Sequence, residues 1–141
     1  RRACSPACRI DRVLTTDRAH ARPLDVKTSS FFDYTGPGRI SIARFPPRGT
    51  PAGFRVYRAL APGPWFKSVD GDEYRRHYAA QLAALDPRAT WDELHALAGG
   101  AEPVLLCWER KADLVAGRAF CHRRIVAEWF AGRLDERVDE R

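Results

Sequence analysis

The feature that most constrains the fold is an apolar run that is followed, after a loop, by an amphipathic pattern. Pro103 to Trp108 is a continuous apolar stretch of strand length, which is typical of a buried strand in a parallel sheet with both faces covered. After a linking loop from Arg110 to Phe120, the apolar side chains from Cys121 onward recur on one face of a helix. This order of strand, loop and helix indicates one unit of an α/β domain.

An earlier strand and two helices complete the predicted domain. Arg39 to Phe45 alternates apolar and polar side chains, which predicts a strand. The Pro- and Gly-rich residues Pro46 to Pro64 that follow predict a loop with a short extended piece at 54–60. Since helices then connect this strand to the late one, we predict an α/β protein, a single small domain with a partly parallel sheet flanked by helices.

The two connecting helices carry recognisable end signals. Asp70 to Leu85 has aromatic and leucine side chains at three- and four-residue spacing, and Asp70 opens a capping box. The second helix begins at either Pro87 or the capping box from Thr90 to Glu93, and Gly99 ends it. Both helices are predicted to be scaffold.

The candidate active site lies where the late strand ends and the last helix begins. Ligands of open parallel sheets collect beyond the carboxyl ends of the strands, so Cys107 and Cys121 are predicted to converge there. The positive end of a helix and the adjacent His122 lower the pKa of a cysteine, making Cys121 a candidate nucleophile or redox thiolate. Cys107 would resolve an oxidised Cys121, and Glu109 completes the candidate catalytic set. The alternative is that both cysteines only pack in the core.

Two arginines are candidates for binding an anion at the same place. Neighbours on a helix point about 100° apart, so only one of Arg123 and Arg124 can face a ligand. We choose Arg123, with Arg44 approaching from the end of the early strand, to bind phosphate or carboxylate. The alternative for Arg123 is a salt bridge to Glu109 or Glu128.

Four segments resemble the family called domain of unknown function 488. They are ISIARFPP (residues 40–47), EYRRHYAAQL (73–82), VLLCWE (104–109) and CHRRIVAEWF (121–130). The resemblance covers roughly residues 26–134. It implies a small α/β protein of bacteria and phages with two recurring cysteines, and it brings no settled activity.

The sequence gives only weak support for a metal site. Cys107, Cys121 and His122 offer three zinc ligands, with Glu109 or His77 as a fourth, but their spacing matches no common zinc pattern. Cys4 and Cys8 resemble half of a zinc site without a second half. We therefore predict no metal and no other cofactor.

Composition limits the location and the partners. No apolar run approaches the roughly 18 to 20 residues that cross a bilayer, and the N-terminal stretch lacks the apolar centre of a signal peptide. We therefore expect no membrane association, a cytoplasmic location and reduced thiols. The net charge of +6 divides into +3 over residues 1–25 and +3 over the remaining chain, so charge alone does not establish nucleic-acid binding. The sequence does not define an oligomeric state.

Residues 1–25 show no pattern that would bury a face, so we expect a flexible extension before an α/β domain at 26–141. Two interpretations stay open: a native extension, and read-through of non-coding sequence upstream of a start at Val26. Mass spectrometry of the endogenous protein distinguishes them.

The leading hypothesis is a small enzyme that uses Cys121, assisted by His122 and Cys107, on an anionic substrate such as a nucleotide or a nucleic-acid end. The rival is a binding module for nucleic acid or protein in which the cysteines are structural. Aromatic and basic side chains alternate over Tyr74 to Tyr78 and at Trp65 to Lys67, as in base-stacking surfaces. The plainer interpretation is that the tyrosines are buried, while Trp65-Phe66 is the best candidate for a lid or a binding surface.

Overall fold

The computed structural model describes residues 24–141. The flexible extension expected over residues 1–25 falls almost entirely outside the described residues, as does the Cys4 and Cys8 pair. Those expectations therefore stay predictions.

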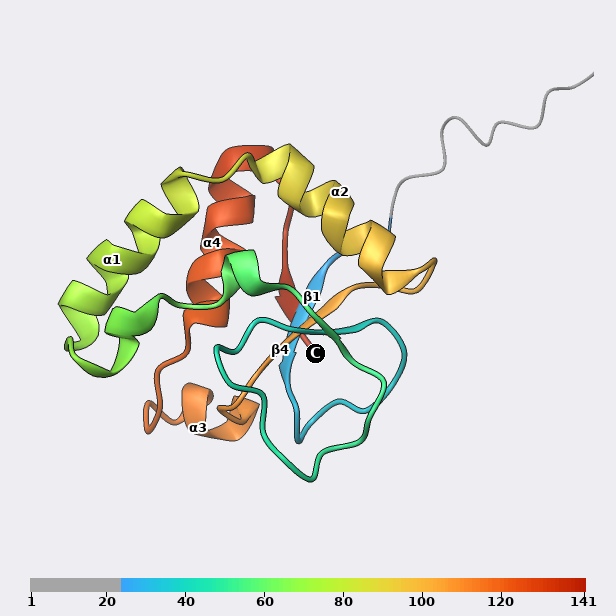
Figure 1. Ribbon diagram of the computed structural model, residues 1–141, viewed down its shortest axis with the longest axis horizontal. Helices are drawn as coiled ribbons and strands as arrows, with labels where there is room; N and C mark the ends of the chain where they lie inside the picture. Colours follow the sequence, from blue (N-terminus) through green and yellow to red (C-terminus); the bar gives the residue numbers. More distant parts are fainter. Residues whose placement is uncertain (1–23) are drawn as a thin grey trace, which may run out of the picture.

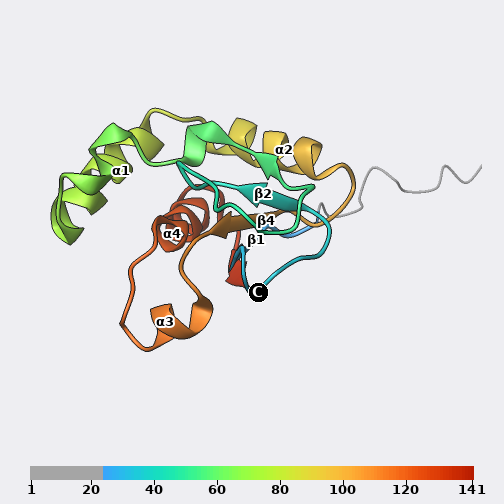
Figure 2. The same cartoon turned by 60° about the horizontal axis from the view of Figure 1, so that its bottom comes forward.

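The centre of the protein is a five-stranded sheet in which every pairing is parallel, in the order β3-β2-β4-β1-β5. Its strands are β1 (Lys27–Ser30), β2 (Arg39–Ser41), β3 (Arg55–Val56), β4 (Val104–Cys107) and β5 (Asp139–Glu140). Figure 1 shows β1 and β4 at the centre of the molecule, and Figure 2 shows β4 between β1 and β2. The predicted α/β class is thus confirmed, with a sheet that is wholly parallel.

The strand predicted at Pro103 to Trp108 is confirmed as β4, and all four of its residues are buried. Successive side chains of a strand point to opposite faces. Leu105 accordingly joins the main core cluster, whereas Val104 and Leu106 join a smaller cluster with Phe31 and Ala43. Both faces of the central strand are therefore covered, which explains the unbroken apolar run.

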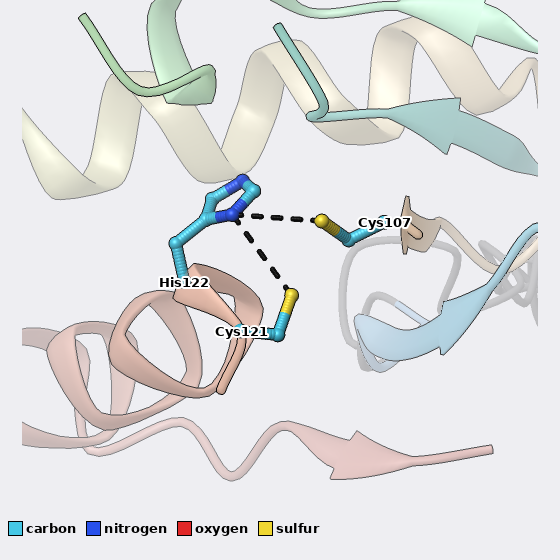
Figure 3. Close-up of side chains that lie close together, drawn as sticks. All are labelled: Cys107, Cys121 and His122. Carbon is cyan, nitrogen blue, oxygen red and sulfur yellow. Dashed lines mark hydrogen bonds between the residues drawn. The ribbon is translucent and has the colours of Figure 1, made fainter. Parts of the chain in front are cut away.

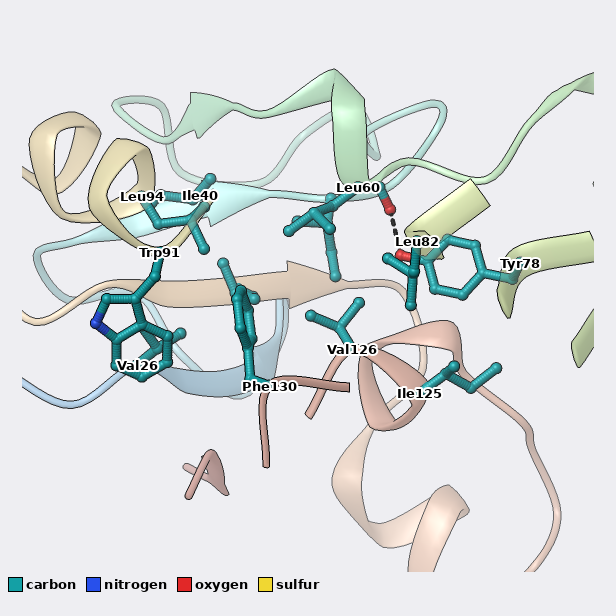
Figure 4. Packing of buried hydrophobic residues seen from close by; sticks show 12 residues of the cluster. Val26, Ile40, Leu60, Tyr78, Leu82, Trp91, Leu94, Ile125, Val126 and Phe130 are labelled. Atoms are coloured by element: carbon teal, nitrogen blue, oxygen red, sulfur yellow. Dashed lines mark hydrogen bonds between the residues drawn. The ribbon is translucent and has the colours of Figure 1, made fainter. Parts of the chain in front are cut away.

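Three long helices pack on the main core: α1 (Gly71–Ala83), α2 (Pro87–Ala98) and α4 (His122–Leu134). Figure 4 shows side chains from all three meeting the sheet. A short helix, α3 (Lys111–Val115), interrupts the segment predicted as a linking loop, and it lies away from α1 and α2 in Figure 2. None of the helices in the described residues is long and apolar enough to span a membrane.

The predicted helix ends are found with small differences. Asp70 caps α1 by accepting a hydrogen bond from the Glu73 amide at 3.1 Å. Helix α2 begins at Pro87, the first of the two predicted starts, because Asp86 caps it through the Ala89 amide at 3.0 Å. Gly99, in the left-handed region, ends it.

The early strand is shorter than predicted. Only Arg39–Ser41 is strand, and the Ile42 amide adds one further bond, 3.0 Å long, to the Leu106 carbonyl. Beyond it the chain leaves the sheet toward Arg44. The loop that follows contains β3 and two short turns of 3-10 helix, Arg58–Leu60 and Pro64–Lys67.

Replacing Gly38 by alanine is expected to lower the free energy of unfolding by at least about 2 kcal/mol. Gly38 has a φ of +79°, and an added Cβ would lie 2.0 Å from the Glu102 carbonyl oxygen. Gly49 is a matched control, since its φ is +77° with nothing within 4 Å, and its alanine variant should lose only about 1 kcal/mol. Urea unfolding of both variants measures the two free energies. Equal losses of stability would mean that the close approach of Gly38 to the Glu102 carbonyl does not matter.

Candidate functional site

Three side chains form a compact cluster at the carboxyl edge of the sheet. Cys107 is the last residue of β4, Cys121 is the N-cap of α4, and His122 is its first residue. The His122 Nδ1 atom lies 3.5 Å from the sulfur of Cys107 and 3.9 Å from that of Cys121. The three potential ligand atoms all lie within 4.8 Å of one another (Figure 3). The predicted convergence of the two cysteines is confirmed, and all three residues are buried.

The orientation of His122 is fixed by the backbone of the early strand. Its Nε2 atom lies 2.8 Å from the Ile42 carbonyl oxygen. Because a carbonyl only accepts, Nε2 donates its proton to it, and Nδ1 faces the two sulfurs. Tyr78 packs edge-on against the ring at 5.3 Å. The imidazole is therefore held ready to accept a thiol proton or, once protonated, to stabilise a thiolate.

The two cysteines differ in their readiness to ionise. Burial opposes ionisation of Cys121, but hydrogen bonds from Cys107 and His122, together with the charges of His122 and Arg123, lower the pKa of Cys121 well below its ordinary value. Hydrogen bonding to Cys121, followed by burial, raises the pKa of Cys107 well above its ordinary value. The arrangement therefore favours Cys121, at the helix start, as the thiol that ionises and Cys107 as the thiol that donates a hydrogen bond to it.

Glu109 lies just after β4 and is half-buried. Burial and the negative charge of Cys121 raise the pKa of its carboxyl group. Within residues 24–141 its buried Oε2 atom has no hydrogen-bond partner. A carboxyl group that retains its proton more readily than usual and keeps one oxygen unengaged is suited to proton transfer.

The cluster lines a cavity of about 690 Å³. Both cysteines, His122 and Glu109 contribute to its wall, together with cations and aromatic rings. The cations are Arg44 and Lys67, and the rings include those of Phe45, Phe66, Tyr74 and Phe120. Cys121 is buried from bulk solvent, but its side chain borders this cavity and can meet a small ligand there.

The structure places the two predicted anion-binding arginines differently. Arg44 lines the cavity, donates to the Pro62 carbonyl at 3.3 Å and lies over the Phe45 ring. The Arg123 side chain is 0% exposed and does not line the cavity. Its Nε donates to Glu140 at 2.6 Å, and it also donates to the Glu109 carbonyl.

Glu140 replaces the predicted salt-bridge partners of Arg123, Glu109 and Glu128. The carboxylate comes from β5, so the ion pair ties the start of α4 to the edge of the sheet. This geometry favours a structural role for Arg123, and anion binding by this residue stays a prediction.

Several cavity residues were not predicted as site residues. Tyr74 and Phe120 pack edge to face at 5.2 Å, and Phe66 lies 6.2 Å from Phe45. Phe120 directly precedes Cys121, and that adjacency is the sequence signal that could have found it. Of the candidate lid, Phe66 lines the cavity, whereas Trp65 stacks on His77 at 5.1 Å.

The cysteine and histidine atoms are also of the types that bind zinc. The two residues predicted as a fourth ligand, Glu109 and His77, do not belong to the group of donor atoms that lie within 4.8 Å of one another. The described residues thus bring together three of the four ligands of a closed zinc site.

These features define a class: a small α/β protein with a buried cysteine-histidine cluster at the carboxyl edge of a parallel sheet. The chain belongs to the family described as "Domain of unknown function DUF488", which it matches over residues 53–130. This match confirms the resemblance found in the sequence over a narrower range, which still includes the whole cluster. Searches of the curated proteins and of the solved structures found no match.

Proposed function

We propose that the protein is a small enzyme that uses the Cys121 thiolate on an anionic substrate bound in the cavity, such as a nucleotide or a nucleic-acid end. The observation that carries this proposal is the oriented cluster itself. Two cysteine sulfurs and a backbone-fixed imidazole lie together at the wall of a cavity. Packing alone does not require these three groups to meet at an opening.

The proposed chemistry is nucleophilic substitution through a covalent intermediate. The Cys121 sulfur attacks an electrophilic carbon or phosphorus, and its new bond forms as the bond to the leaving group breaks. Protonated Glu109, whose pKa is raised by burial and by Cys121, gives the leaving group its proton. The Glu109 carboxylate then takes a proton from the water that releases the product and restores the thiolate.

The cavity wall supports an anionic substrate that carries a ring. Arg44 and Lys67 supply positive charge, and each lies over a cavity aromatic, at 5.6 Å from the Phe45 ring and 5.4 Å from the Phe66 ring, respectively. Aromatic faces beside cations accept a nucleobase and its phosphate together. This combination favours a nucleotide over a simple inorganic anion.

Adenosine 5′-monophosphate is expected to protect Cys121 from alkylation by iodoacetamide, because the nucleotide and the reagent would occupy the same cavity. Arg44→Gln should weaken the protection about tenfold, since it removes a charged contact to phosphate. Arg76→Gln, an exposed position on α1 that does not line the cavity, is the matched control. Equal protection of wild type and Arg44→Gln, or none at all, would count against a nucleotide in this site.

The non-catalytic alternative makes a different prediction. Salt-dependent binding of DNA or RNA that is unchanged by Cys107→Ser and Cys121→Ser would favour a binding module. The proposed enzyme requires instead that any turnover found for the wild type be lost in Cys121→Ser.

Elemental analysis of the purified protein tests the third hypothesis, a metal centre. Because the proposal needs a thiolate that is not occupied by a metal, we expect much less than one zinc per chain, and we expect a chelator to leave the alkylation rate of Cys121 unchanged. About one zinc per chain, with faster alkylation after chelation, would favour the metal centre.

A further inference from the structure

We propose that the site is also redox-sensitive: a peroxide oxidises Cys121, and Cys107 then closes a reversible disulfide with it. The inference rests on the proposed function in one respect, that Cys121 is the ionised thiol. It adds a modification of that site and a means of switching it off.

The geometry brings the two sulfurs together from separate elements. Cys107 ends β4 and Cys121 precedes the first turn of α4, yet their sulfur atoms lie within 4.8 Å of each other. Formation of a disulfide would bring the sulfurs to about 2 Å. Both side chains line the same cavity, so the reagent and the resolving thiol reach Cys121 at one place.

The two cysteines have complementary roles. Cys121 receives hydrogen bonds and lies beside the positive charge of Arg123, as an attacking sulfur requires. The Cys107 sulfur lies 3.5 Å from His122 Nδ1. Because Cys107 ionises less readily than Cys121, it is the weaker nucleophile toward the peroxide, but the imidazole beside it can take its proton when it attacks.

The disulfide forms in two steps. First, the Cys121 thiolate attacks one oxygen of the peroxide, the oxygen-oxygen bond breaks, and a sulfenic acid and hydroxide form, so that sulfur loses two electrons. Second, Cys107 attacks the Cys121 sulfur as its proton passes to His122 Nδ1. The sulfur-sulfur bond forms, the hydroxyl group leaves, and that proton converts it to water.

The disulfide removes the nucleophile and so blocks the proposed activity. A dithiol reductant restores both thiols by exchange: it donates two electrons and its own two sulfurs form a disulfide. Without Cys107, the sulfenic acid of Cys121 has no partner in the cluster, and a second molecule of peroxide oxidises it to the sulfinic acid as that peroxide is reduced to water.

The test treats the full chain carrying Cys4→Ser and Cys8→Ser with hydrogen peroxide and then maps peptides by mass spectrometry. We expect a disulfide between Cys107 and Cys121 that dithiothreitol reverses. Adding Cys107→Ser should increase sulfinic acid at Cys121 at least about tenfold. Sulfinic acid at Cys121 without a disulfide when both cysteines are present, or no oxidation of either one, would overturn the inference.

Two further measurements separate this inference from the proposed function. The yield and reversibility of the disulfide are measured on the chain that retains both cysteines, so they stand even if the Cys107→Ser chain folds poorly. Alkylation and nucleotide protection are measured on reduced protein. Rapid alkylation of Cys121 without formation of a disulfide would contradict only the redox inference. A disulfide that forms in a protein whose Cys121 is not protected by the nucleotide would support the redox inference and contradict the proposed substrate.

Discussion

Replacing Arg123 by methionine is expected to lower the free energy of unfolding by about 3–5 kcal/mol, as measured by urea titration. The Arg123 side chain is fully buried, and the Glu140 side chain that it pairs with is 16% exposed. Removing one member of a buried ion pair leaves the other charge without its partner in a place of low dielectric constant. The Glu109 carbonyl would lose a donor as well.

Arg124→Met is the matched control, because Arg124 is the next residue of α4 and is exposed. It should change the free energy of unfolding by no more than about 0.5 kcal/mol. A loss of under about 1 kcal/mol in Arg123→Met, accompanied by a loss of nucleotide protection, would instead support the anion-binding role predicted from the sequence.

Cys107→Ala is expected to raise the pKa of Cys121 by about one to two pH units. The thiol of Cys107 donates to the Cys121 thiolate, and a hydrogen bond to a charged group contributes about 1.5–3 kcal/mol. The measurement is the pH profile of Cys121 alkylation, whose midpoint should move upward. Below that midpoint the variant should alkylate about tenfold more slowly than wild type for each pH unit of the shift.

Cys107→Ser tests the physical reason for this effect. A hydroxyl group keeps the hydrogen-bond donor at nearly the same position, so the midpoint should stay closer to that of the wild type than in Cys107→Ala. Identical midpoints in the wild type and both variants would mean that Cys107 does not stabilise the thiolate.

The late strand and the last helix could be predicted because their signals are local. A strand buried on both faces requires the run of Val104 to Cys107, and the amphipathic face of α4 defines where it packs. The ends of parallel strands and the starts of the helices that follow them meet at one edge of a sheet. The proximity of Cys107 and Cys121 followed from that rule.

Other elements depend on contacts that local patterns do not contain. Strand β1 has the sequence KTSS, yet three of its four residues are buried, and β4 and β5 pair with it on its two sides. Strand β5 is two residues long, and its Glu140 supplies the partner of Arg123. The orientation of His122 depends on the Ile42 carbonyl, which is 80 positions away in the chain. Spacing along the sequence does not reveal these pairings.

The most direct test of the account is the rate of iodoacetamide alkylation at Cys121 as a function of pH, resolved by peptide mapping in the reduced Cys4→Ser, Cys8→Ser chain. Because the pKa of Cys121 lies well below its ordinary value, the thiolate persists as the pH falls. We predict a rate at pH 7 above that of free cysteine, and little change between pH 8 and pH 7, where the rate of free cysteine falls several-fold. If Cys121 reacts no faster than free cysteine, and its rate falls several-fold between pH 8 and pH 7 as that of free cysteine does, then Cys121 only packs in the core.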